Sequence, residues 1–219
     1  DTAATVSSAL NKHRKIGGNQ RAFGSAIAAA INHDKFDEES VGLIGETLRA
    51  TSRLGGSDSE QKTFLHLLPA MEHSRIDITN FKEYMHRLLQ HRQSHRDHLQ
   101  LADSMSTAIN QLTTPPKGED YSERFSNAII ETFFSLLKTH HQQGGNQHEL
   151  AQGVYTRPQS GRATESENLA ALFTTAVQEI YDRRRNPHEE MHKLGRKLSN
   201  PLARPKDELL SYFKRRHGL

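Results

Sequence analysis

The chain has 219 residues, a mean hydropathy of −0.77 and 34% hydrophobic residues, so we expect a soluble protein with no membrane-spanning helix. It has no Cys, which excludes disulfides, thiolate metal sites and a Cys nucleophile. The net charge of +3 is uneven: residues 183–219 carry eleven Lys and Arg against four Asp and Glu, and the remaining residues carry 18 against 22. This basic tail predicts an anionic partner, which could be an acidic protein, nucleic acid or lipid.

Apolar residues recur at intervals of three and four along nearly the whole chain, which predicts an all-α fold with no sheet. A first helix is expected over about residues 6–15. Gly17 and Gly18 then end it, and Asn19 caps the next helix. A third helix ends at Gly55, where a left-handed backbone conformation is easy.

Further capping signals divide the middle of the chain. Ser57 and Glu60 predict a capping box for a fourth helix, and Asp77 or Thr79 can cap a fifth. That fifth helix loses every apolar residue over 90–98 before its pattern resumes, so this stretch should be exposed or bent.

The widest apolar stripe follows the break at Pro115 and Pro116 and predicts a central core helix. His140 and His141 end this helix, where cationic imidazoles would favour the C-terminal dipole. Later in the chain, Thr164 with Glu167 forms a second predicted capping box.

We therefore expect about nine to ten helices in a multi-helix bundle or a short irregular α-solenoid. Residues 1–152 should form an acidic-to-neutral helical core, and 153–163 a flexible loop. Residues 164–219 should supply the C-terminal helices with the basic tail, packed on the same core.

The four letters Gly-Gly-Asn-Gln occur twice, at residues 17–20 and 144–147. A fixed period would indicate a solenoid repeat, but the spacing of such connectors along the chain is irregular. The pattern favours convergent turn chemistry, because Gly followed by a capping Asn is a simple way to join two helices.

An HExxH string begins at His188 and predicts, as an alternative, a zinc-dependent metallopeptidase. His188 and His192 would bind Zn²⁺, Glu189 would act as the general base, and Glu208 could be a third ligand. Several features weigh against it: the string starts at a helix N-terminus, Leu198 stands where a third ligand is needed, and no strand is evident. The favoured prediction therefore has no catalytic residue and no cofactor.

The favoured prediction is that the chain is a non-enzymatic helical protein–protein interaction module. The proposed partner-binding residues are the basic residues of the tail and three histidines expected on one exposed helix face. They are Arg183, Arg184, Arg185, Lys193, Arg196, Lys197, Lys214, Arg215, Arg216, His91, His95 and His98.

The composition, without Cys or Trp, suits a secreted bacterial effector that binds a host protein. The location would then be the cytoplasm or a host cell, and no signal peptide is recognisable. A helical nucleic-acid binder using the basic tail is a further alternative, although helix-turn-helix, RRM and KH signatures are missing.

Overall fold

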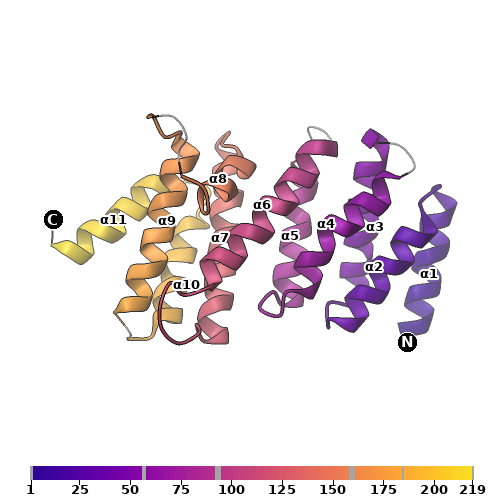
Figure 1. The fold of residues 1–219 in the computed structure, drawn as a ribbon, viewed down its shortest axis with the longest axis horizontal. Helices are drawn as coiled ribbons and strands as arrows, with labels where there is room; N and C mark the ends of the chain where they lie inside the picture. Colours follow the sequence, from indigo (N-terminus) through magenta and orange to yellow (C-terminus); the bar gives the residue numbers. More distant parts are fainter. Residues whose placement is uncertain (1, 56–57, 92–94, 158–160, 184, 219) are drawn as a thin grey trace. The chain divides into compact units, whose positions relative to one another are not determined.

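The computed structural model describes residues 2–55, 58–91, 95–157, 161–183 and 185–218. Within these residues the fold is all-α, with eleven helices and no strand (Figure 1). The predicted class is confirmed, but the expected count of nine to ten is too low. The predicted fifth helix is two helices, because one ends at Gln90 and the next begins at His95.

The helices fall into two compact units, Asp1–Asp103 and Ser104–Leu219, which meet within α6. The first unit contains α1 (Thr2–Lys15), α2 (Gln20–Asn32), α3 (Glu38–Gly55), α4 (Ser59–Glu72), α5 (Ile78–Gln90) and the start of α6 (His95–Thr113). The second contains the rest of α6, α7 (Glu123–Gln142), α8 (Gln147–Gly153), α9 (Glu165–Asp182), α10 (Pro187–Leu198) and α11 (Pro205–His217).

Residues 153–163, the predicted flexible loop, connect α8 and α9, which pack against each other inside the second unit. Residues 158–160 of the predicted flexible loop lie outside the described residues.

The first unit has two layers of helices. In one layer α3 contacts α1 and α5, and in the other α2 contacts α4. Consecutive helices form hairpins that cross between the layers, as in short arrays of helix pairs (Figure 1). Fully buried side chains such as Leu48, Phe81 and Tyr84 fill the space between the layers.

Helix α7 is the core helix of the second unit, as its wide apolar stripe predicts. Twelve of its side chains are buried, including Phe125, Phe133 and Phe134. Its closest neighbour is α10, where Gly195 leaves no room for a side chain: a Cβ there would lie 2.7 Å from Thr132 Oγ1. The Thr132 hydroxyl also donates a hydrogen bond to the Met191 carbonyl oxygen, so α10 is fixed against the core.

Helix ends mostly follow the sequence signals. The capping box of Thr164 and Glu167 at α9 is present, and Asp77 caps α5. The capping box predicted for α4 depends on Ser57, which lies outside the described residues. Helix α4 begins at Ser59 with Asp58 at its N-cap position, and the Glu60 carboxylate accepts the Asn19 backbone N–H.

Two turns have almost the same structure, at residues 13–20 and 140–147. Gly17 and Gly144 have φ angles of +75° and +84°, which glycine adopts at little cost. In the first turn the Gly18 N–H donates to the His13 carbonyl at 2.9 Å, and in the second the Gly145 N–H donates to the His140 carbonyl at 2.8 Å. Helix α1 and helix α7 therefore end in the same Schellman-type hydrogen bond.

Among the described residues, no helix combines the length and the apolar character needed to cross a membrane.

Candidate functional site

A groove of about 550 Å³ lies between α10 and α11 in the second unit. Five cationic and two anionic side chains contribute to its lining, together with one aromatic, one aliphatic and one amide side chain. The lining residues are Glu190, Lys193, Leu194, Arg196, Lys197, Asn200, Glu208, Tyr212, Arg215 and Arg216. This α10–α11 groove gathers five of the nine basic residues that the sequence predicts for partner binding.

The positions of the groove residues follow from helical periodicity. Met191, Leu194 and Leu198 are buried on the face of α10 that packs on the core, so the intervening basic residues lie toward solvent. On α11, Leu209 is fully buried and holds the helix in place. The turn between the two helices is fixed by Gln143, whose side-chain amide donates to the Ala203 carbonyl oxygen.

Part of the groove lining is an ion-pair network centred on Glu190. Its Oε1 lies 3.2 Å from Lys193 Nζ, and its Oε2 lies 3.2 Å from Arg216 Nη2. The Arg216 guanidinium also lies over the Tyr212 ring, 5.5 Å from its centroid, in a cation–π contact. Burial raises the pKa of Tyr212, so its hydroxyl is neutral at physiological pH.

The three other cations of the groove lining, Arg196, Lys197 and Arg215, have no carboxylate within ion-pair distance among the residues that the structure describes. Arg196 and Arg215 are exposed and Lys197 is half-buried. Three cations that converge on a concave surface can bind carboxylate or phosphate oxygens.

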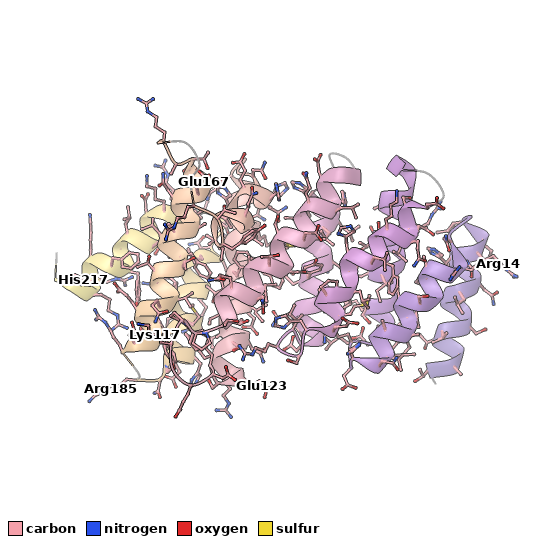
Figure 2. The ribbon with its side chains drawn as sticks, in the orientation of Figure 1. Arg14, Lys117, Glu123, Glu167, Arg185 and His217 are labelled. Carbon is pink, nitrogen blue, oxygen red and sulfur yellow. The ribbon has the colours of Figure 1, made fainter. Side chains whose placement is uncertain are left out.

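The remaining basic residues of the tail lie outside the groove lining. Arg183 and Arg185 are exposed in the turn between α9 and α10, where Figure 2 labels Arg185. Arg184 lies outside the described residues. Lys214 is exposed on α11 but does not contribute to the lining. The predicted basic tail is thus divided between a groove and separate surface positions.

The three histidines predicted to share an exposed helical face do not form such a surface. His91 follows the end of α5 and His98 lies in α6, so no continuous helix joins them. They are only 8% and 3% exposed. The side chain of His95 lies outside the described residues. The stretch over 90–98 was expected to be exposed or bent: the end of α5 at Gln90 and the start of α6 at His95 agree with the second alternative, whereas the burial of His91 and His98 contradicts the expected exposed face.

The HExxH string does lie on a helix, at the start of α10. His188 is half-buried, Glu189 is exposed, and His192 Nδ1 lies 3.4 Å from Glu131 Oε2. Within the described ranges, no three His, Asp or Glu side chains are grouped so that they could hold a metal ion. Glu208, the proposed third ligand, lines the α10–α11 groove, whereas His188 and His192 do not.

Three lining residues, Glu190, Asn200 and Tyr212, were not predicted from the sequence as site residues. Glu190 precedes Lys193 by three positions, a spacing that brings side chains together on one face of a helix. This spacing could have predicted the ion pair between Glu190 and Lys193 from the sequence. The contact of Glu190 with Arg216 joins two helices and has no sequence signal.

Comparisons with models of known protein families, with curated proteins and with solved structures found no match.

Proposed function

We propose that this chain is a non-enzymatic helical interaction module that binds an acidic segment of a partner protein in the α10–α11 groove. The observation that carries the proposal is that Arg196, Lys197 and Arg215 lie together on a concave surface and form no ion pair with any carboxylate of the described ranges. A volume of about 550 Å³ is within the range of sites that hold a small ligand or a few residues of a peptide.

A protein segment fits this groove better than a nucleic acid does. Glu190 and Glu208 lie among the cations, and each would repel a phosphate backbone that passed through the groove. The aromatic lining residue Tyr212 is only 8% exposed, so it offers no open ring on which a base could stack. An acidic peptide can place its carboxylates at the free cations and avoid the two glutamates.

The test is a charge-removal variant of the free cations. In a variant with Arg196→Ala, Lys197→Ala and Arg215→Ala, we expect the affinity for a fluorescent hexaglutamate peptide to fall by about tenfold or more, measured by anisotropy at low salt. A matched control removes the same charge outside the groove lining through Arg183→Ala, Arg185→Ala and Lys214→Ala. The control should lose less than about threefold. Equal losses in the two variants would show that only net charge matters and would overturn the proposal.

A further inference from the structure

The α10–α11 groove already contains an anion supplied by the chain itself. Both carboxylate oxygens of Glu190 are used, one by Lys193 Nζ and one by Arg216 Nη2, each at 3.2 Å. Arg216 is held further by its contact with the Tyr212 ring. Two of the five groove cations are therefore paired in the structure as it stands, and both pairs depend on one side chain.

We propose that Glu190 determines which anions the groove accepts. This inference rests on the proposed function. The Glu190 carboxylate keeps Lys193 and Arg216 occupied, so that a ligand meets only Arg196, Lys197 and Arg215. The groove then takes a protein segment with two or three carboxylates and disfavours the continuous phosphate chain of a nucleic acid.

The physical reason is that the two ligand classes depend differently on the number of available cations. Nucleic-acid binding grows with each phosphate that a cation neutralises, because each contact releases condensed counterions. A carboxylate inside the binding surface removes two such contacts and adds repulsion. A short acidic peptide uses few contacts, and the three free cations are enough for it.

The neighbouring Glu189 provides a matched control. It is exposed on the same helix and carries the same charge, but it does not line the α10–α11 groove. Glu190→Gln and Glu189→Gln therefore raise the net charge equally, and only the first releases Lys193 and Arg216. Circular dichroism of both variants checks that α10 and α11 stay folded.

The experiment measures binding of a short DNA duplex and of the hexaglutamate peptide from about 50 to about 200 mM salt. For Glu190→Gln we expect the duplex to bind about tenfold more tightly at low salt, and its slope of log K against log salt to steepen by about 1.8 for two added contacts. The peptide affinity should change less than about threefold. Glu189→Gln should change either affinity less than about threefold.

Equal effects of the two substitutions on duplex binding would overturn the role of Glu190. So would an unchanged salt slope of duplex binding in Glu190→Gln, because it would mean that Lys193 and Arg216 add no phosphate contact when residue 190 is neutral. A wild-type protein that fails to bind the peptide would instead contradict the proposed function. The duplex arm would still report on Glu190 in that case, so the two failures can be told apart.

Discussion

The turns at residues 13–20 and 140–147 share a His, two Gly, an Asn and a Gln at the same positions, and each histidine lies against the second glycine of its own turn. They differ in what faces the imidazole. His13 Nε2 lies 3.4 Å from the Glu60 carboxylate of α4, and its ring stacks on Phe23 at 4.3 Å. His140 Nε2 lies 2.9 Å from the Ser166 hydroxyl of α9.

This difference distinguishes contacts that form within the turn from contacts that depend on how distant helices pack. The glycines and the hydrogen bonds of the turn are set by residues within the motif itself. The partner of each histidine comes from a helix that begins later in the chain, at the second residue of α4 or of α9. One local motif is therefore completed by a carboxyl group in the first unit and by a neutral hydroxyl in the second.

The largest expected effect comes from filling the space beside each imidazole. A Cβ at Gly18 would lie 2.2 Å from the His13 ring, and a Cβ at Gly145 would lie 2.2 Å from the His140 ring. Both rings are buried and must move, so Gly18→Ala and Gly145→Ala should each lower the free energy of unfolding by about 3 kcal/mol in urea denaturation.

Gly42→Ala is the control for these substitutions, because a Cβ there meets open space on α3. It should raise the free energy of unfolding by about 0.5–1 kcal/mol through helix propensity. Hydrogen exchange should place the added flexibility of Gly18→Ala in the first unit and that of Gly145→Ala in the second. A loss below about 0.5 kcal/mol in either variant would mean that its imidazole is not closely packed.

A smaller effect should separate the two partners of the histidines. Glu60→Ala removes the acceptor for both His13 and the Asn19 backbone N–H, and should lower the free energy of unfolding by about 2 kcal/mol. Ser166→Ala removes one hydrogen bond to His140 and should cost about 1 kcal/mol.

The control on α4 is Glu72→Ala, an exposed residue that should change the free energy of unfolding by less than about 0.5 kcal/mol. If Ser166→Ala destabilised the protein more than Glu60→Ala, the carboxyl group would not be the stronger link, and the comparison between the turns would be reversed.

The sequence predicted the features that depend on residues close together in the chain. The backbone preference of glycine predicted the helix ends at Gly17 and Gly144, and the apolar spacing predicted the core helix α7. It could not predict that Glu60 accepts the Asn19 backbone N–H, because that contact joins positions 41 residues apart. A matching His four residues before each Gly-Gly pair was visible, but its burial was not.

The candidate site shows the same limit. The excess of Lys and Arg over residues 183–219 predicted a binding surface there, and the α10–α11 groove lies within these residues. The sequence does not show which of the cations are paired, because Arg216 contacts Glu190 on another helix. The prediction that His140 is a cationic helix cap was wrong for a related reason: the ring is 7% exposed, and burial lowers its pKa.

The smallest expected effect is the pH dependence of the second turn. Burial is the main cause of the lowered pKa of His140, and the nearby His141 lowers it further, while Glu165 and Glu149 oppose both. The folded protein therefore favours neutral His140, whereas the unfolded chain takes up a proton near its ordinary pKa of 6.5. The contribution of neutral His140 to the free energy of unfolding is therefore complete above a pH of about 6.5 and is lost as the pH falls toward the pKa of His140 in the folded protein.

We expect His140→Gln to reduce the loss of unfolding free energy between pH of about 6.5 and about 5.5, by up to about 1 kcal/mol. His73, whose pKa is also lowered by burial, contributes an acid-dependent loss in every variant, so the measurement is the difference between variants. His141→Gln is the comparison variant on the same turn: it removes only the smaller repulsion that His141 exerts on His140, so it should reduce the loss by much less than His140→Gln does. If His140→Gln kept the wild-type slope, protonation of His140 would not be coupled to unfolding, and the two turns would differ in their partners without differing in their response to acid.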